Sequence, residues 1–332
     1  MKAAVRNRYG SLDVVELRDV DRPVPADDQV LVRVRAASVN RADLDLLAPL
    51  PSFTRLFLGL RAPRNPRMGI DVAGVVEEVG AGVTRFRPGD AVFADLYSFG
   101  AGSFAEFACA PEKAFLAIPS GMSFDVAATL PHSAILALQG LRLRGGRRIV
   151  GPGDTVLIDG ASGNVGPFAV QIAKHLGAEV TAVCRTERID MVRSLGADHV
   201  IDYTKVDYTT TGERYDWILD TGSHHSMVRI RRSLKPNGVY VTLGGSSWRI
   251  LQAMFLGLLV SRGRRWMGLM LWWKPFDPAD VATLVELIAA GNLTPLIDRA
   301  YPLSAVVEAL RRVDEGRAIG KVIVTIDPPE RR

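Results

Sequence analysis

A glycine-rich turn between a buried strand and a helix constrains the fold of this chain more than any other feature. The apolar run TVLID leads into GASGNVG at residues 160–166, and PFAVQIAKHLG follows with the period of a helix. Glycines let a backbone turn sharply beside a pyrophosphate, and the free N–H groups at the helix start favour phosphate charge. The turn therefore predicts a dinucleotide-binding βαβ unit, although Ala161 replaces the first glycine of the usual motif. An ordinary tight turn is the alternative.

Strands and helices alternate on both sides of this turn. After the first strand and helix, the pattern predicts the strand AEVTAVC, a helix around 188–195, the strands HVIDY and YDWILDTG, a helix that ends near Asn237-Gly238, and the strand VYVTLGG. Such alternation is typical of a doubly wound parallel sheet.

The first 120 residues have a different pattern. QVLVRVRAASVN alternates apolar and polar positions, and DVAGVVEEVG and DAVFAD are further short strands between Gly, Pro and Asp turns. Closely spaced strands of this kind indicate a small barrel or sandwich. The closing strand KVIVTI is expected to return to it. The fold class is therefore α/β, with a β-rich domain at 1–122 and 296–332 and a parallel-sheet domain at 123–295.

Composition excludes several other classes of protein. The 332 residues are enough for two domains, each with its own core. The 41 basic and 36 acidic side chains give a net charge of +5, which is a weak argument for binding to nucleic acid. We therefore do not expect nucleic acid as a partner. Two cysteines build no disulfide framework, so we expect a cytoplasmic protein. The apolar stretch 250–260, followed by three arginines, is about half a membrane span. A buried helix or lid is favoured over contact with a membrane surface.

The end of the second strand of the parallel sheet indicates the cofactor. NAD enzymes carry there a carboxylate for the ribose hydroxyl, whereas this chain has Cys184, Arg185 and Thr186, with Arg188 close behind. A guanidinium binds a 2′-phosphate through paired hydrogen bonds. The sequence therefore predicts NADPH. The alternative is that both arginines are ordinary solvated charges.

Three segments in this order resemble the medium-chain dehydrogenase/reductase superfamily: ASVNRADL, GIDVAGVVEEVGAGVTRFRPGDAVF, and the glycine turn with its helix. The similarity is to the quinone oxidoreductase-like branch, near the reticulon-interacting-protein-like reductases. The resemblance implies a GroES-like substrate domain, a Rossmann domain, a homodimer, and hydride transfer from NADPH to a quinone or an activated, enone-type double bond.

The resemblance also implies that no metal takes part. The zinc alcohol dehydrogenases carry a cysteine ligand where this chain has Asn40, and a histidine where it has Ile70. Neither residue is a useful zinc ligand. Two alternative functions stay open: a zinc-free alcohol or aldehyde dehydrogenase, and a cofactor-binding regulatory or membrane-associated protein with little turnover.

Site residues follow from the glycine turn, from the strand ends and from the resemblance. For catalysis we expect Asn40, Asp43 and Tyr97. Local backbone hydrogen bonding at the end of a strand is the alternative for Asn40 and Asp43, and it explains Asp43 equally well. His132 has a suitable ordinary pKa for a proton donor, but the resemblance supports no such role. The expected cofactor-binding residues are Asn40, Ser162, Gly163, Asn164, Val165, Gly166, Cys184, Arg185, Thr186, Arg188, Tyr203, Thr221, Gly222, Leu243, Gly244, Gly245 and Lys321. Trp272 and Trp273 are assigned either to a roof over the substrate or to a core or dimer contact.

Overall fold

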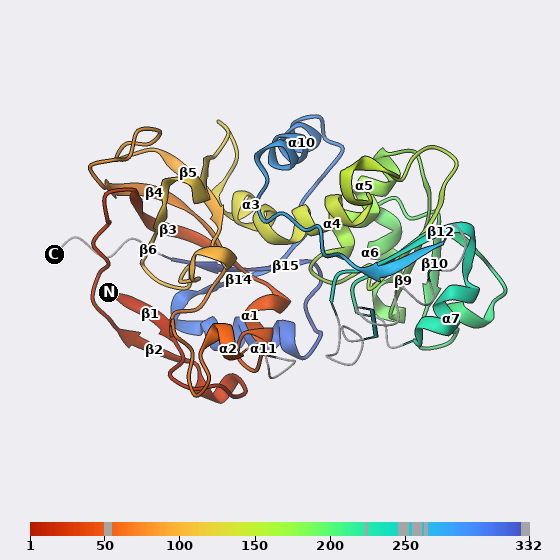
Figure 1. The fold of residues 1–332 in the computed structure, drawn as a ribbon, viewed down its shortest axis with the longest axis horizontal. Coiled ribbons are helices and arrows are strands. Elements are labelled where there is room, and N and C mark those ends of the chain that lie inside the picture. Colours follow the sequence, from red (N-terminus) through yellow and green to blue (C-terminus); the bar gives the residue numbers. More distant parts are fainter. Residues whose placement is uncertain (50–54, 223–224, 245–251, 254–260, 262–264, 327–332) are drawn as a thin grey trace. The chain divides into compact units, whose positions relative to one another are not determined.

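A computed structural model describes residues 1–49, 55–222, 225–244, 252–253, 261 and 265–326 (Figure 1). The chain forms two compact units. The first unit comprises Met1–His132, Pro275–Val285 and Pro295–Arg332, and the second unit comprises Ser133–Lys274 and Glu286–Thr294. The domain limits 122/123 and 295/296 stay a prediction. Of the helices within the described ranges, none is both long enough and apolar enough to cross a membrane.

The first unit is built on β-strands, as expected. Its main sheet has the order β14-β15-β3-β4-β5-β7, with β6 paired to β3 and a separate ribbon of β1 and β2. The last strand, β15, pairs antiparallel with β3, so the closing strand does return to the β-rich unit. The strands are β1 (Lys2–Val5), β2 (Glu16–Asp19), β3 (Gln29–Val39), β4 (Asp71–Val79), β5 (Ala91–Asp95), β6 (Phe107–Pro111), β7 (Phe115–Ala117), β14 (Ile297–Pro302) and β15 (Lys321–Thr325).

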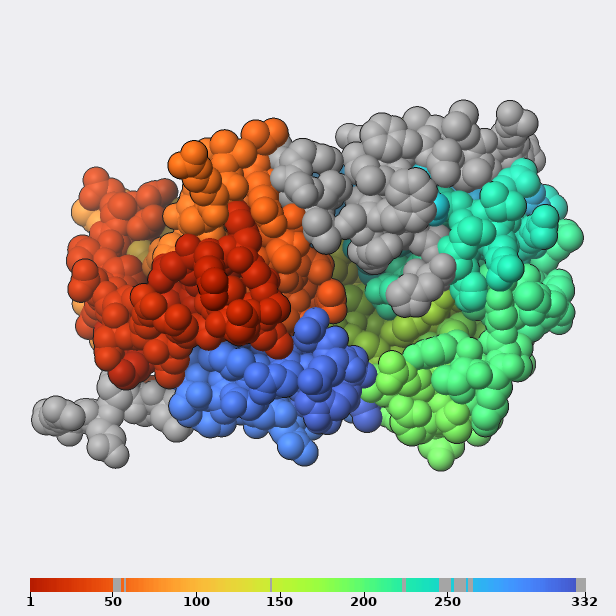
Figure 2. All heavy atoms as spheres, turned by 90° about the horizontal axis from the view of Figure 1, so that it is seen from below, coloured from red at the N-terminus to blue at the C-terminus, as the bar shows by residue number. Residues whose placement is uncertain are grey.

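Apolar side chains from these strands and from α11 form a large core in the first unit, and Ala3, Val5 and Ala105 form a smaller cluster. Helix α3 packs against β3, β4 and β15, and α11 packs against β14 and β15. Figure 2 shows the N-terminal segment, in red, beside the blue residues of the C-terminal part, which belong to the same unit. The helices here are α1 (Arg41–Asp45), α2 (Arg55–Leu58), α3 (Phe124–Thr129) and α11 (Val306–Asp314), and α10 (Pro278–Ala289) has residues in both units.

The second unit contains the predicted parallel sheet. All six strands run parallel in the order β10-β9-β8-β11-β12-β13. From β8, the chain first adds strands on one side of the sheet (β9, β10) and then on the other side (β11, β12, β13). This is the doubly wound order, in which ligands bind at the carboxyl ends of the strands. The elements are β8 (Thr155–Asp159), β9 (Glu179–Cys184), β10 (His199–Asp202), β11 (Tyr215–Asp220), β12 (Leu234–Thr242), β13 (Trp266–Leu269), α4 (Ile135–Gly140), α5 (Gly166–His175), α6 (Ile189–Ser194) and α7 (Met227–Arg232).

One predicted boundary in this unit is wrong. The helix expected to end near Asn237-Gly238 is α7, which ends at Arg232, and these two residues lie within β12. Tyr215 pairs with Leu234 and Trp217 pairs with Val239, so β12 is bulged between these pairs. Pro236 has no N–H for the ladder, which accounts for the interrupted pairing. The turn-forming residues therefore mark a bulge rather than a helix end.

The glycine turn packs α5 closely against the end of β8. Gly160 has φ +82°, a conformation that side chains disfavour. A Cβ on Gly166 would lie 2.3 Å from the Gly160 carbonyl oxygen and 2.4 Å from the Ala161 carbonyl carbon. A Cβ on Gly163 would meet only the Gly160 oxygen, at 3.5 Å, which is ordinary contact. Gly166 is thus required for packing, whereas Gly163 is not.

Replacing Gly166 by alanine should therefore destabilise the protein, because backbone atoms must move to make room. We expect a loss of roughly 1–3 kcal/mol in the free energy of unfolding, measured by urea denaturation. Gly163→Ala is the matched control in the same turn and should stay within about 0.5 kcal/mol of wild type. Equal midpoints for the two variants would contradict this account of the turn.

Candidate functional site

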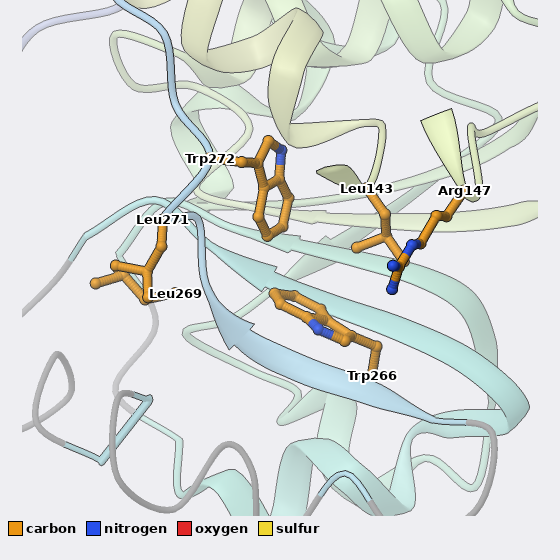
Figure 3. Close-up of a pocket in the computed structure, with 6 residues that line it drawn as sticks. All are labelled: Leu143, Arg147, Trp266, Leu269, Leu271 and Trp272. Atoms are coloured by element: carbon orange, nitrogen blue, oxygen red, sulfur yellow. The ribbon is translucent and has the colours of Figure 1, made fainter. Parts of the chain in front are cut away.

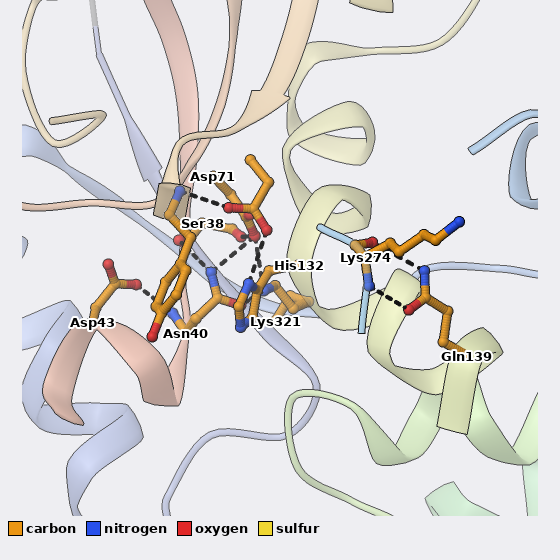
Figure 4. Close-up of polar contacts among 10 residues, drawn as sticks. Ser38, Asn40, Asp43, Asp71, His132, Gln139, Lys274 and Lys321 are labelled. Carbon is orange, nitrogen blue, oxygen red and sulfur yellow. Dashed lines mark hydrogen bonds and ion pairs between the residues drawn. The ribbon is translucent and has the colours of Figure 1, made fainter. Parts of the chain in front are cut away.

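Seven polar side chains gather inside the first unit, and none is more than 7 % exposed. We call this set the buried polar cluster: Ser38, Asn40, Asp43, Asp71, Asp95, His132 and Lys321. Figure 4 labels all of them except Asp95. Its members come from β3, α1, β4, β5 and β15 and from the helical segment that follows α3. Buried charges cost free energy unless they are paired, so the partners of each group decide what the cluster can do.

Asn40 is the hub of the cluster. It precedes α1, and its side chain turns inward: Nδ2 donates to Asp71 Oδ2 at 2.9 Å, and Oδ1 accepts from Lys321 Nζ at 2.6 Å. The structure therefore brings together Asn40 and Lys321, two residues that the sequence analysis selected separately. Local backbone bonding is present as well, because Nδ2 also donates to the Ser38 carbonyl at 3.4 Å and the side chain takes part in a capping box with Asp43.

Lys321 is fully buried at the start of β15. Its ammonium lies 3.4 Å from Asp71 Oδ2, and Asp71 also accepts a hydrogen bond from Ser38 Oγ at 2.7 Å. Burial lowers the pKa of Lys321, and the Asp71 charge opposes that effect. Burial likewise raises the pKa of Asp71, against the attraction of Lys321. The contact joins the C-terminal strand to β4 through charge.

Asp43 makes the local backbone hydrogen bond that is the alternative to a catalytic role. Its Oδ2 accepts the backbone N–H of Asn40 at 2.8 Å, which satisfies a donor at the start of α1. Burial raises the pKa of Asp43 to about 7. The carboxyl group therefore exchanges a proton near neutral pH, while its hydrogen bond positions Asn40.

Asp95 and His132 form a hydrogen-bonded pair in the same cluster. Asp95 Oδ2 lies 2.9 Å from His132 Nδ1, and Asp95 Oδ1 accepts the backbone N–H of Tyr97 at 2.7 Å. Burial lowers the pKa of His132, but the charge and hydrogen bond of Asp95 outweigh it, so the pKa is raised above its ordinary value. Sequence reasoning had no signal for this pair, because Asp95 is one of many acids that end a short strand.

Tyr97 lies next to this pair in the short helical turn Tyr97–Phe99. Its ring centroid is 5.9 Å from that of His132, and 43 % of the residue is exposed. Burial raises the pKa of the Tyr97 phenol, and the charges of Asp45 and Asp95 act in the same direction. The phenol thus holds its proton more tightly than a free tyrosine does.

The second unit holds most of the expected cofactor residues at the carboxyl ends of its strands. Ser162, Gly163, Asn164 and Val165 follow β8, and α5 starts at Gly166. Thr221 Oγ1 donates to the Asp159 carbonyl at 2.8 Å, and the Gly222 N–H donates to Asp220 Oδ1 at 2.9 Å. Leu243 and Gly244 follow β12, whereas Gly245 lies outside the described residues.

The residues present fit a nicotinamide dinucleotide. A Cβ on Gly222 or Gly244 would meet no described atom within 4 Å, so the backbone is open to a ligand there. The glycine turn leads directly into α5, which begins with Gly166 and Pro167 and runs for ten residues. Backbone N–H groups and a helix start at the carboxyl end of β8 suit a pyrophosphate.

The two predicted arginines occupy different environments. Arg185 is exposed and its Nε donates to the hydroxyl of Tyr203, which is itself 48 % exposed. Arg188 is only 8 % exposed, and its Nη1 donates to Ser162 Oγ at 3.2 Å in the glycine turn. The alternative of ordinary solvated charges is therefore wrong for Arg188. It positions the turn, and Arg185 is the exposed guanidinium.

Asp202 is a neighbour of this region that sequence reasoning missed. It ends β10 and pairs in register with Cys184, the last residue of β9. Hydrogen bonds from the hydroxyls of Thr186 and Thr204 hold the pKa of Asp202 well below its usual range. Burial raises the pKa of the Cys184 thiol to about 11, so that residue shapes the site without reacting.

A separate pocket of about 260 Å³ lies beside β13, the last strand in the described order of the parallel sheet (Figure 3). Trp272 meets Trp266 edge to face, with ring centroids 5.0 Å apart. Trp272 is therefore a wall of this pocket within the second unit. The other lining residues are Leu143, Arg147, Leu269 and Leu271. Most of the apolar stretch 250–260 lies outside the described residues.

Comparison with known proteins gives consistent matches. The profile of the family Zinc-binding dehydrogenase matches residues 195–324, and that of the Alcohol dehydrogenase GroES-like domain matches residues 26–120. The mouse mitochondrial NAD(P)H oxidoreductase RTN4IP1 is 31 % identical over 359 residues, which cover 98 % of this chain and 89 % of that protein. The 2-methylene-furan-3-one reductase of Solanum lycopersicum is 32 % identical over 339 residues, which cover 98 % and 79 %.

The fold has a close counterpart among solved structures. The quinone oxidoreductase from Coxiella burnetii superimposes with a TM-score of 0.86 at 26 % identity, covering 98 % of this chain and 99 % of that chain. A GroES-like unit and a Rossmann unit in one chain define a two-domain oxidoreductase that uses a nicotinamide cofactor and a small-molecule substrate. The chain belongs to the medium-chain dehydrogenase/reductase superfamily, which confirms the resemblance and the predicted fold class.

The raised pKa of Asp43 predicts a pH dependence of stability. Because its folded pKa of about 7 exceeds the unfolded value, the stabilisation is complete below the unfolded pKa and is lost as pH rises toward 7. Asp43→Asn mimics the protonated form and keeps an acceptor for Asn40. Between about pH 5 and pH 7.5 the free energy of unfolding should fall less in this variant than in wild type, by on the order of 2–4 kcal/mol.

Urea denaturation at both pH values measures this difference. Asp13→Asn is the control, because a hydrogen bond from Ser11 lowers the pKa of Asp13 and its effect lies at more acidic pH. That variant should lose stability over the interval as wild type does. Identical slopes for Asp43→Asn and wild type would show that Asp43 is ionised throughout.

Proposed function

We propose that this oxidoreductase is a zinc-independent, NADPH-dependent reductase of quinones or of activated, enone-type double bonds. The observation that carries the cofactor choice is the end of β9. The exposed guanidinium of Arg185 is held there by Tyr203, and no carboxylate stands at Cys184, Arg185 or Thr186. A dianionic 2′-phosphate suits that guanidinium. The names of the relatives, a quinone oxidoreductase and a furanone reductase among them, support the substrate class.

In this proposal each unit supplies one part of the chemistry. The nicotinamide cofactor, when bound, supplies the hydride. In the second unit the glycine turn, with Ser162 held by Arg188, binds the pyrophosphate. In the first unit Lys321 holds the side chain of Asn40, and both remain candidate cofactor-binding residues. Asp43 positions Asn40 through the start of α1. Tyr97, the third residue expected to take part in catalysis, is a candidate proton donor.

Zinc independence rests on the chemistry of the side chains. Asn40 and Ile70 stand at the positions of the cysteine and histidine ligands, and the Asn40 amide is engaged by Asp71 and Lys321. An amide in such a network is a poor zinc ligand. Within the described ranges no group of three or more His, Cys, Asp or Glu side chains is arranged so that it could hold a metal ion.

The remaining partners belong to the proposal as well. We propose a homodimer that uses the outer edge of the parallel sheet, where β13 is the last strand of the described order and Leu271 is 74 % exposed. Exposed apolar side chains beside a strand edge favour pairing with another chain. We also propose a cytoplasmic location and no nucleic-acid partner, on the basis of the two cysteines and the small net charge.

A turnover assay tests the proposed reaction directly. Purified protein is mixed with NADPH and a panel of quinones and enones, and the decrease in nicotinamide absorbance is followed with and without a zinc chelator. We expect turnover that the chelator leaves unchanged. Turnover only with an alcohol, NADP⁺ and added zinc would overturn the proposal.

The cofactor preference is tested separately by Arg185→Ala. If Arg185 binds the 2′-phosphate, its loss removes a charge-assisted hydrogen bond of about 1.5–3 kcal/mol, a tenfold to hundredfold weaker NADPH affinity. NADH affinity should barely change. Fluorescence titration gives both dissociation constants.

Arg193→Ala is the matched control for this experiment, since it removes the same charge from an exposed side chain of α6. It should change neither constant by more than about twofold, the scale of a surface charge. A wild-type preference for NADH, or equal small effects of both variants on NADPH, would refute the assignment of Arg185.

A further inference from the structure

Asp95 and His132 form a buried pair that has no part in the proposed function described above. Both residues are buried in the first unit, at 1 % and 7 % exposure, and their side chains meet at 2.9 Å. We propose that His132 is the proton donor of the reduction and that Asp95 is the positioning residue that orients its ring. This inference rests on the proposed reduction and adds the group that completes it.

The contacts of Asp95 set the orientation of the imidazole. One carboxylate oxygen accepts the N–H of Tyr97 at 2.7 Å, so the other oxygen is held toward His132. A carboxylate only accepts hydrogen bonds, so His132 Nδ1 carries the hydrogen of this contact. The opposite ring nitrogen, Nε2, is then the atom that transfers a proton to a substrate.

The surroundings of His132 favour the protonated form of its ring. Asp71 on β4 and Asp95 on β5 raise its pKa, whereas burial and Lys321 on β15 lower it, and the net direction is upward. Asp43 and Asp45 on α1 also lie within electrostatic reach. General acids work best when their pKa is near the working pH. Tyr97, whose pKa is raised above that of a free phenol, is the weaker acid.

The proton step balances with the hydride transfer. Hydride adds to the β-carbon of an enone, and the electron pair of the double bond shifts to the α-carbon and carbonyl. The Nε2–H bond of His132 breaks and a C–H bond forms at the α-carbon, which leaves a neutral imidazole. Water returns a proton to the ring before the next turnover, so the sum is one hydride and one proton added to the substrate.

The experiment compares pH profiles of kcat/KM for NADPH-dependent reduction of cyclohexenone. In wild type, kcat/KM should fall about tenfold per pH unit above the pKa of His132, because only the imidazolium donates. His132→Gln can still donate to Asp95 but has no titrating group. We expect its kcat/KM to be lower by about 10²–10⁴-fold and nearly independent of pH over that range.

A matched histidine provides the control. His199 on β10 contacts Glu179 at 2.7 Å on the surface of the second unit, so His199→Gln makes the same change in a similar pair. It should keep the wild-type profile. Tyr97→Phe should also keep the fall in kcat/KM with pH, because the imidazole remains. Disappearance of the fall in Tyr97→Phe would assign the donor to Tyr97 and overturn the inference.

A second variant covers the case that His132→Gln does not fold. Asp95→Asn keeps the shape of the pair but removes the charge, so the fall in kcat/KM should move to lower pH. A profile of Asp95→Asn or His132→Gln that equals that of wild type would overturn the inference. That result leaves the proposed function intact if wild type reduces the enone or a quinone. The absence of any wild-type turnover would instead overturn both.

Discussion

The first unit depends on the buried contacts that the ammonium group of Lys321 makes with Asn40 and Asp71. It is fully buried, and it donates to Asn40, 281 residues earlier in the chain, while Asp71 supplies the opposing charge. Removing one partner of such a group leaves an unpaired buried charge, which typically costs about 3–5 kcal/mol. The contact therefore ties the closing strand to β4 and α1, and it fixes the side chain of Asn40 at the same time.

Residues of the same buried polar cluster hold the structure together and also carry groups that can exchange protons. Asp43 accepts the backbone N–H of Asn40 at the start of α1, and burial raises its pKa to about 7. Asp95 binds both a backbone N–H and an imidazole. Groups with shifted pKa values in one buried place are typical of functional sites, but ion-pair networks in a core have the same property. The measurements on Asp43 and His132 separate the two, because one reads stability and the other reads the rate of a proton step.

The second unit solves a different problem, the binding of a large anion. Gly160 and Gly166 bring α5 against the end of β8, and Arg188 is buried to hold Ser162 in that turn. The turn thus gains a fixed shape before any ligand arrives, which lowers the entropy cost of binding. Arg185 stays exposed, so it can be exchanged without disturbing the turn. Because Arg188 holds the turn and Arg185 does not, the preference for NADPH or NADH can be tested by replacing Arg185 without destabilising the fold.

The sequence by itself determined the features that arise from local patterns. Alternating periods and the glycine turn fixed the parallel sheet, and KVIVTI was recognisable as a strand of the first unit. Local signals also misled, since Asn237-Gly238 marks a bulge in β12 instead of a helix end. Only the tertiary structure paired Lys321 with Asn40, joined Asp95 to His132, and buried Arg188 beside Ser162. The reason is physical: periodicity and turn chemistry act over a few residues, whereas burial and charge pairing are decided by segments that meet only after the chain has folded.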